Sequence, residues 1–223
     1  MTGAARPRVT LKLATSLDGR IALANGASQW ITGPESRAEV HRMRAAHEAI
    51  LTGIGTILAD NPRLTARPEG GCDRQPELLI LDSDLRTPVG SRVLAKPQCR
   101  SVNIFHVASS EREGRVAQEL ELAGADLWRV QEKHGRPSVV AAISHGGFTS
   151  VMIEAGAQIA ASAIAADLVD RIEWFRAPVV LGGDGLPVVA ALGLETLEAA
   201  PIFKRTGIRE RGADLQESYE RIR

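Results

Sequence analysis

The segment from Thr52 to Arg67, TGIGTILADNPRLTAR, collects residue types that could do chemistry. Gly53-Ile54-Gly55 would let the backbone turn tightly and approach a ligand, and Thr56 stands where a helix would begin, which suits a phosphate. Asp60-Asn61-Pro62 ends that helix, because proline disfavours helical dihedrals in the residue before it. The segment is therefore either the edge of an active site or an ordinary strand-to-helix turn with a surface loop, since short glycine motifs also occur without ligands.

Two more charged residues come from predicted strands. Residues 9–14 alternate in the period of a strand with one buried face, and Lys12 lies on the face opposite the leucines. Lys12 therefore either snorkels at a sheet edge or projects into a site. Glu154 ends the apolar run 150–153, where a carboxylate costs desolvation energy unless it is hydrogen-bonded. It is either paired structurally or it serves a ligand.

Glycine-rich and alanine-rich stretches follow these strands. The residues after Gly156 are small, so the free N–H groups and the dipole of the next helix could accept an anion such as a pyrophosphate, although such helices also simply pack against sheets. The glycines among residues 182–185 either let the backbone approach a flat ligand closely or form an ordinary tight connection.

The elements that must position these residues predict an α/β fold. A helix over 33–46 places Arg44 beside its apolar stripe, where it could reach into a cleft. Residues 77–82 read as a strand buried on both faces, which ends in Asp82-Ser83 where open α/β sheets bind ligands. Strands and helices alternate, which favours a mainly parallel sheet. We expect further strands at 49–52, 102–108, 126–130, 171–175 and 178–181, and a closing antiparallel hairpin of 203–211 and 215–222. A helix over 110–124 should begin with a capping box of Ser110 and Glu113 and end at Gly124. Another helix should run from Pro137 to Gly146-Gly147, with Val139, Val140 and Ile143 facing inward.

The composition indicates one soluble globular domain spanning 1–223. Acidic and basic residues are equal in number, at 27 each, so bulk charge gives no reason to expect nucleic acid or an anionic membrane as a partner. Cys72 and Cys99 lack the spacing of a zinc site or a disulfide framework, so no metal is expected. The absence of a long apolar run favours a cytoplasmic protein.

Six motifs carry a resemblance to a known family. LKLATSLDGRIA, SQWITGPESR, ILTGIGTILADNPRLTAR, LILDSDLRTP, VMIEAGAQIAAS and APVVLGGDG together resemble the reductase domain of the bifunctional riboflavin-biosynthesis deaminase-reductase, in order and over essentially the whole chain. The resemblance implies a dihydrofolate-reductase-like fold, a mixed and mainly parallel sheet flanked by helices. It also implies NADPH as cofactor and a homodimer.

The implied reaction reduces C1′ of the ribose in 5-amino-6-(5-phosphoribosylamino)uracil. The ribosylamine must open to an imine that is protonated before hydride arrives, so an acid and a neighbouring charge are needed. Lys12 and Asp60 are our hypothesis for that pair, with exchangeable roles, and Glu154 would accept N–H groups of the pyrimidine. The resemblance places cofactor contacts at Ala14, Trp30, Thr56, Asp60, Ser83, Gly156, Ala157, Gln158, Ile159, Ala160, Ala161 and Ser162, and substrate contacts at Ser28, Arg44, Leu64, Arg67 and Glu154.

Several of these roles follow from residue type. Arg44 and Arg67 could grip the ribose phosphate in bidentate fashion. Ser83 and Arg86 would meet the adenosine 2′-phosphate, which favours NADP over NAD. For Trp30, a backbone contact with the ring merely packed is as plausible as a ring contact.

The chain also departs from the family pattern. Ala157-Gln158 stands where proline and threonine are common, and Val179 where a lysine is common. The deaminase signature, H-x-E with P-C-x-x-C, is absent from this sequence. The alternatives are a reductase of the same fold that takes the un-deaminated pyrimidine or dihydrofolate, and a nucleotide-binding paralogue without catalysis.

Overall fold

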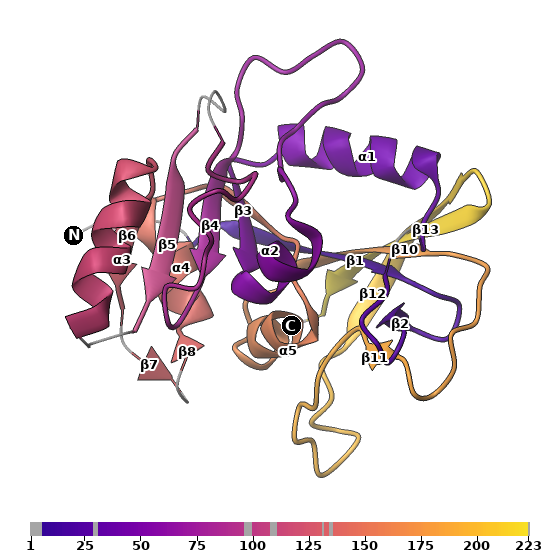
Figure 1. The fold of residues 1–223 in the computed structure, drawn as a ribbon. Helices are drawn as coiled ribbons and strands as arrows, with labels where there is room; N and C mark the ends of the chain where they lie inside the picture. The colour runs from indigo at the N-terminus through magenta and orange to yellow at the C-terminus, as the bar shows by residue number, and fades with distance from the viewer. Residues whose placement is uncertain are drawn as a thin grey trace. The chain divides into compact units, whose positions relative to one another are not determined.

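The computed structural model describes residues 6–28, 31–95, 100–107, 111–130, 132–133 and 136–222 (Figure 1). Its contacts divide the chain into two compact units. The first is built mainly from His41–Val151, and the second from Arg8–Val40 and Met152–Arg223. The chain passes from one unit to the other and back, so neither is a continuous stretch of sequence. The expectation of one domain over 1–223 stays a prediction.

The first unit is built on parallel strands. β3 (Ala49–Gly53), β4 (Glu77–Leu81), β5 (Val102–His106) and β6 (Asp126–Arg129) lie side by side in that order, and each neighbouring pair is parallel (Figure 1). β3 and β5 are buried at every position, which explains their near-continuous apolar sequences. The strands predicted around residues 49, 77, 102 and 126 are confirmed.

Three helices accompany this sheet: α2 (Ile54–Asp60), α3 (Glu111–Leu122) and α4 (Val139–His145). α3 ends before Gly124, whose φ of 96° is left-handed, as expected of a helix terminator. The serine of the capping box expected at the start of α3 lies outside the described residues.

The start of α4 differs from the prediction. Ser138, not Pro137, caps α4 by accepting a hydrogen bond from the Ala141 N–H, while Pro137 belongs to the two-residue strand β8 (Arg136–Pro137), which pairs with β7 (Glu132–Lys133). The expectation that Val140 faces inward is wrong, because its side chain is 44% exposed. The fixed φ of proline is compatible with the short strand β8 as well as with the first turn of a helix.

The second unit contains a mixed sheet. β1 (Arg8–Thr15) and β10 (Arg171–Arg176) are parallel, and β13 (Asp214–Arg221) pairs with β10 and with β12 (Phe203–Arg211) in antiparallel fashion. The β12–β13 hairpin turns at Gly212, whose φ is 64°. The predicted fold class, a mixed and mainly parallel sheet with helices and a C-terminal antiparallel hairpin, is confirmed.

Two helices and three short strands complete the chain: α1 (Pro34–Ala45), α5 (Ala157–Ala165), β9 (Ser150–Ile153), β2 (Arg20–Ala22) and β11 (Leu186–Pro187). The helix predicted over 33–46 is therefore confirmed, and its inner side chains Val40 and Met43 are buried. β2 pairs with β11 rather than with its own neighbours in sequence.

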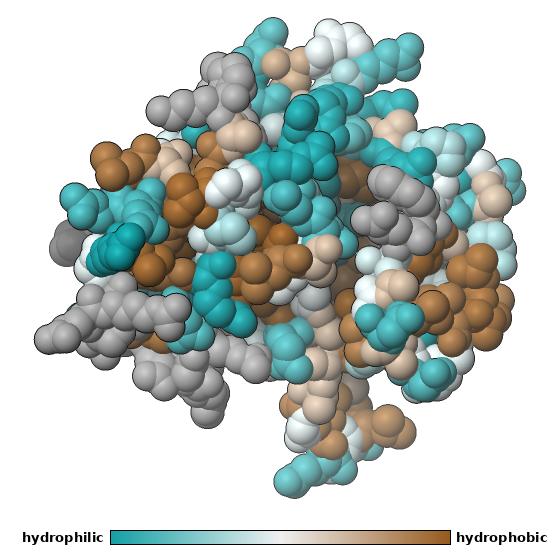
Figure 2. All heavy atoms as spheres, viewed as in Figure 1, coloured by the Kyte–Doolittle hydropathy of each residue, from teal (hydrophilic) through white to brown (hydrophobic). Residues whose placement is uncertain are grey.

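The strand predicted at 178–181 is wrong. Val179 O accepts from Leu17 N, and the Leu181 N–H is donated to the side chain of Asp18, so this backbone bonds to a turn and not to a sheet ladder. Exposed apolar side chains gather at this end of the second unit, around β2 and β11 (Figure 2), and include Leu17, Leu23, Val179, Val180 and Leu186. No helix among the described residues is long and apolar enough to cross a membrane.

Candidate functional site: a loop held among arginines

Several arginines of the first unit lie in or beside the loop 61–67, which follows α2. Five arginines, Arg44, Arg63, Arg67, Arg92 and Arg100, make up what we call the basic cluster. Burial and the charges of Arg44, Arg63 and Arg92 lower the pKa of Arg67. Burial and Arg44 lower the pKa of Arg100 to about 10. Since like charges gathered this closely disfavour one another, the cluster suits an anionic ligand.

Side chains from α1 hold the centre of this loop. Arg44 donates to Thr65 O at 3.2 Å, and His41 Nδ1 lies 3.1 Å from the same carbonyl. His41 and Arg44 are one helical turn apart, so both reach the loop from one face of α1. The Arg67 guanidinium meets the Thr65 hydroxyl and lies 3.3 Å from His41 Nε2.

The rest of the loop is fastened by residues that follow it in sequence. Gln75 accepts from Ala66 N and donates to Ala66 O, both at 2.8 Å, as a neighbouring strand would. Arg100 donates to the carbonyls of Leu64 and Arg63, each at 2.6 Å. The loop is thus rigidly held although it forms no regular structure, and it carries two predicted substrate residues, Leu64 and Arg67.

No carboxylate among the described residues forms an ion pair with Arg67 or Arg100. Arginine forks that are held in place without an acidic partner are suited to phosphate. The structure brings Arg44 to the loop that contains Leu64 and Arg67. The role of these three residues as substrate contacts stays a prediction.

Asp60 is the last residue of α2, and its side chain is exposed beside this loop. Asn61 follows it in the left-handed region, with φ 39°, and its N–H closes the helix on Ile57 O. Proline at position 62 explains why the helix stops there. Asp60 thus stands at a rigid helix end next to the basic cluster in sequence.

The expected tight glycine turn before α2 is wrong. Gly53 has φ −119°, which any residue adopts, and Gly55 already lies inside the helix. α2 has only seven residues, and Thr56 lies half-buried in its first turn. The local glycine pattern therefore marks a strand-to-helix junction, and the cofactor role of Thr56 stays a prediction.

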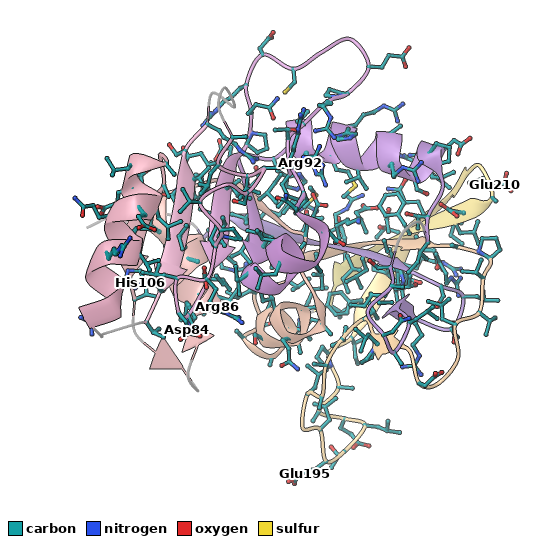
Figure 3. All side chains as sticks on the ribbon, in the orientation of Figure 1. Asp84, Arg86, Arg92, His106, Glu195 and Glu210 are labelled. Atoms are coloured by element: carbon teal, nitrogen blue, oxygen red, sulfur yellow. The ribbon has the colours of Figure 1, made fainter. Side chains whose placement is uncertain are left out.

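A second polar turn follows β4 at its carboxyl end. Asp82 is fully buried, and its Oδ2 accepts from Thr87 N at 2.7 Å and from the Thr87 hydroxyl at 2.8 Å, which fixes the turn. Ser83 lies half-buried next to it. Asp84 and Arg86 lie side by side on the surface here (Figure 3), 4.0 Å apart.

The second unit holds the other predicted catalytic groups. Lys12 is half-buried on β1, and its register partner on β10 is Glu173. Partners in a ladder share a sheet face, so the lysine and this carboxylate project to the same side. Ala14, two residues along β1, lies on that face too and is half-buried.

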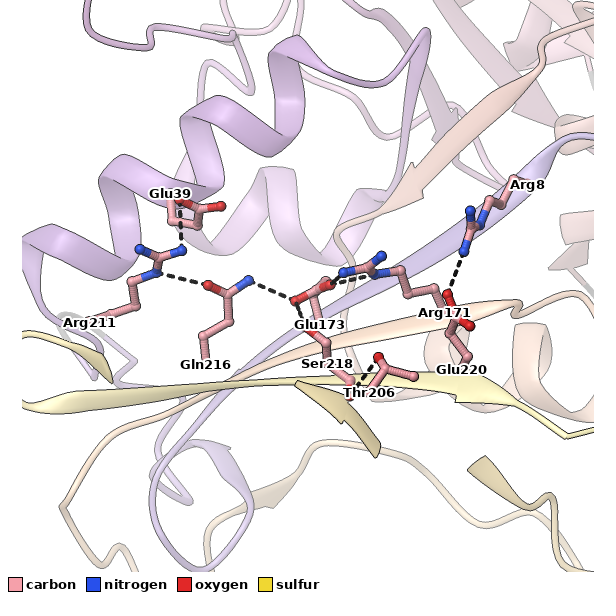
Figure 4. A network of polar contacts seen from close by, with 9 residues as sticks. All are labelled: Arg8, Glu39, Arg171, Glu173, Thr206, Arg211, Gln216, Ser218 and Glu220. Atoms are coloured by element: carbon pink, nitrogen blue, oxygen red, sulfur yellow. Dashed lines mark hydrogen bonds and ion pairs between the residues drawn. The ribbon is translucent and has the colours of Figure 1, made fainter. Parts of the chain in front are cut away.

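Glu173 is the centre of a polar network that the sequence did not suggest (Figure 4). Glu173 is 3% exposed, and its carboxylate accepts from Arg171, from Gln216 at 2.7 Å and from Ser218 at 2.9 Å. Arg211 links Gln216 to Glu39 on α1. A buried carboxylate that accepts from three donors has its hydrogen-bonding needs met without a ligand, so the network is a structural support for the face that carries Lys12.

Glu154 lies between β9 and α5, and its side chain is only 8% exposed. α5 begins after Gly156, where an added Cβ would meet nothing within 4 Å of it. Ala157 and Gln158 in the first turn are half-buried and exposed, whereas Ala160 and Ala161 are buried.

The later residues of the α5 segment are already engaged. Ile159 N and Ala160 N both donate to Gly156 O, and the Ser162 hydroxyl donates to Gln158 O at 2.9 Å. Of the predicted cofactor run 156–162, its first three residues therefore offer the most accessible backbone. The cofactor role of the run stays a prediction.

Two predicted contacts remain, Ser28 and Trp30. Ser28 is half-buried in the loop before α1, and Trp30 lies outside the described residues. Asp18 accepts from Ser16 Oγ, Leu181 N and Gly182 N at 2.6, 3.1 and 2.8 Å. These bonds lower the pKa of Asp18 to about 2, the Ser16 hydroxyl contributing most, and they hold the glycine loop that begins at Gly182.

Sequence reasoning missed three residues that build the site: His41, Gln75 and Arg100. His41 could have been found, since it lies three residues before Arg44 on the same face of a predicted helix. Gln75 and Arg100 act through hydrogen bonds to backbone 9 and 36 residues away, for which the sequence carries no periodic signal.

Comparisons with known proteins agree with this architecture. The family described as RibD C-terminal domain matches residues 7–216. The chain is 36% identical over 217 residues to the riboflavin biosynthesis protein RibD of Escherichia coli (strain K12), covering 94% of this chain and 58% of that protein. The chain thus spans little more than half the length of several curated relatives that it matches.

Another relative matches along nearly its whole length. The 2,5-diamino-6-ribosylamino-4(3H)-pyrimidinone 5′-phosphate reductase of Methanothermobacter thermautotrophicus is 34% identical over 217 residues, which are 96% of this chain and 98% of that protein. Among solved structures, Acinetobacter baumannii RibD superimposes with a TM-score of 0.83 at 28% identity, covering 98% of this chain and 59% of that one. From its fold, its motifs and these matches, the chain belongs to the RibD C-terminal domain family.

Proposed function

We propose that the protein is an NADPH-dependent reductase of a phosphoribosylaminopyrimidine, with 5-amino-6-(5-phosphoribosylamino)uracil as its substrate and 5-amino-6-(5-phosphoribitylamino)uracil as its product. The observation that carries this proposal is the basic cluster around the loop 61–67 in a chain of the RibD C-terminal domain family. A phosphorylated sugar supplies an anion that suits this cluster, in which Arg67 and Arg100 have no carboxylate partner among the described residues. A pterin such as dihydrofolate carries no phosphate and offers the arginines only the carboxylates of its glutamate tail.

A second candidate substrate is the un-deaminated pyrimidine. It is favoured by the match to the Methanothermobacter protein, whose name specifies a diamino-pyrimidinone 5′-phosphate and which this chain covers over 98% of its length. The two substrates share the phosphate and differ on the pyrimidine ring. Glu154 is our proposed contact for that ring, because a carboxylate accepts from amino or ring N–H groups.

The described residues fit NADPH at the start of α5. The backbone at Gly156 is open, Ala157 adds only a methyl group, and a helix start favours a pyrophosphate. Ala14, Thr56 and Ser83 are the further contacts, and Arg86 would attract the 2′-phosphate. When bound, NADPH supplies the hydride for C1′.

The chain's own side chains hold the substrate and manage the proton. Arg44 and Arg67 grip the phosphate, and Asp60 supplies or relays a proton to the imine nitrogen at C1′. Lys12 holds the ribose hydroxyls. Since Lys12 belongs to the second unit and Asp60 to the first, their pairing stays a prediction.

Two features of the wider assembly also stay predictions. By family analogy we expect a homodimer located in the cytoplasm. Size-exclusion chromatography with light scattering would test the dimer independently of activity.

The direct test mixes purified protein and NADPH with each substrate in turn and follows the oxidation of NADPH by its absorbance. We expect oxidation with the uracil, or with its un-deaminated precursor, and none with dihydrofolate. Oxidation with dihydrofolate alone would overturn the proposal, and an absence of turnover with all three would favour a nucleotide-binding paralogue.

A further inference from the structure

Arg100 forms hydrogen bonds to the backbone of a loop that lies more than thirty residues before it in the sequence. It lies two residues before β5 and reaches the loop 61–67, where Nη1 donates to Leu64 O and Nη2 donates to Arg63 O, both at 2.6 Å. Two terminal nitrogens of one planar guanidinium thus hold two successive carbonyls. Lysine has a single ammonium group and cannot reproduce this fork.

The backbone that Arg100 holds is conformationally demanding. Leu64 has φ 50°, a left-handed conformation that residues other than glycine adopt rarely, and its side chain is only 4% exposed. Arg67 follows three residues later. The direction in which Arg67 leaves the loop therefore depends on the turn that Arg100 fixes at Leu64.

A neutral side chain could have held the loop, as the next contact shows. Gln75 fastens Ala66 with two hydrogen bonds of 2.8 Å and brings no charge. Arg100 instead brings a cation that has no carboxylate partner among the described residues. Burial and Arg44 lower its pKa, yet to about 10, so it remains charged at neutral pH. An unneutralised cation beside Arg44 opposes folding but favours an anion.

We propose that Arg100 is a positioning residue for phosphate recognition. Its fork sets the loop 61–67 so that Arg67 and Arg44 can face one phosphate, and its charge strengthens the positive potential there. The proposal rests on the proposed function in assigning a phosphate to the basic cluster, and it adds a residue that touches neither substrate nor cofactor.

The test compares Arg100→Gln and Arg100→Lys with Arg115→Gln. Arg115 is an exposed arginine on α3 in the same unit, paired with Glu119, and is a control for loss of a surface charge. For each protein we would measure kcat, the KM values of substrate and NADPH, and the Kd of ribose 5-phosphate by calorimetry. Ribose 5-phosphate is a probe that reports phosphate binding without any turnover.

For Arg100→Gln we expect the KM of the substrate and the Kd of ribose 5-phosphate to rise about tenfold or more, as the loss of one charge-assisted interaction predicts. The KM of NADPH should be unchanged, because the cluster does not hold the cofactor. Arg100→Lys keeps the charge but loses the fork, so its Kd should lie between those of the wild type and Arg100→Gln. Arg115→Gln should match the wild type.

Each other outcome has a definite meaning. Unchanged phosphate binding in Arg100→Gln, or equal losses in phosphate and NADPH binding, would overturn the proposal, and so would a wild type that does not bind ribose 5-phosphate. If both variants fail to fold by circular dichroism, Arg100 is a purely structural clamp and the proposal is also overturned. If the wild type binds ribose 5-phosphate through Arg100 but reduces no pyrimidine, the proposed function fails while this inference stands.

Discussion

Lys12 and Glu173 are register partners in the parallel pairing of β1 with β10, and their side chains project from the same face of the sheet. The glutamate is buried and its two oxygens accept from Arg171, Gln216 and Ser218. Its negative charge offsets the positive charges of Arg171, with which it forms an ion pair, and of Lys12 on the same face. The face that carries the predicted catalytic lysine is thus built around a fixed carboxylate.

We expect Glu173→Gln to lower the free energy of unfolding by about 1–3 kcal/mol, because the new NH2 group would face a donor with no acceptor available. Urea denaturation followed by circular dichroism measures this. Glu220→Gln is the matched control, since Glu220 pairs with Arg8 on the surface at 2.7 Å and should cost less than about 1 kcal/mol. Equal losses in both variants would contradict the structural role given to Glu173.

Replacement of the proposed proton-handling pair should affect turnover. We expect Asp60→Asn and Lys12→Met each to lower kcat by roughly 100-fold or more, the usual contribution of a positioned acid or base. Asp73→Asn and Lys204→Met change the same residue types at exposed positions and should leave kcat unaltered. A folded Asp60→Asn or Lys12→Met protein with near-normal kcat would remove that residue from the mechanism.

The phosphate grip should appear mainly in KM. Arg67→Lys keeps a positive charge but loses the planar fork, so we expect the KM of the substrate to rise about tenfold with a smaller change in kcat. Arg44→Met should raise KM further, because it also removes the hydrogen bond to Thr65 O. Arg42→Met, on the exposed side of α1, is the control. A fall in kcat at constant KM would argue against a binding role.

Arg86 offers a test of the cofactor preference. Its side chain is exposed and its ion pair with Asp84 is long, at 4.0 Å, so little energy holds it away from a ligand. If it meets the 2′-phosphate, Arg86→Met should raise the KM of NADPH about tenfold and leave that of NADH unchanged. Steady-state kinetics with both cofactors decide this, and parallel changes in the two KM values would exclude the contact.

The contribution of Asp18 to the stability of the second unit should depend on pH. Its pKa in the folded protein is about 2, below the ordinary 3.8, so its stabilisation is complete above about pH 4 and is lost as the pH falls through 2. The difference in Tm between wild type and Asp18→Ala should therefore be constant from pH 7 to about 4 and shrink below it. Thermal melts in a pH series measure this, and a difference that grows on acidification would contradict the assignment.

Several features followed from the sequence because they depend on local period and local stereochemistry. The alternation around Lys12 predicts β1, Pro62 ends α2, and the apolar run before Asp82 predicts a buried strand. The face of α1 that carries Arg44 also follows from helical spacing alone. The motifs spread along the chain further pointed to its family.

The tertiary structure decided the surroundings of those residues. The pairing of β1 with β10 brings Glu173 beside Lys12, although the two residues are 161 positions apart in sequence. The loop 61–67 is held by hydrogen bonds from Gln75 and Arg100. Segment 178–181 is apolar like a strand but is irregular, because the Leu181 N–H donates to the side chain of Asp18 and Val179 O accepts from the Leu17 N–H. A side chain's own period sets its direction, whereas its partner is chosen by strand order and loop path, which involve residues distant in sequence and leave no local pattern.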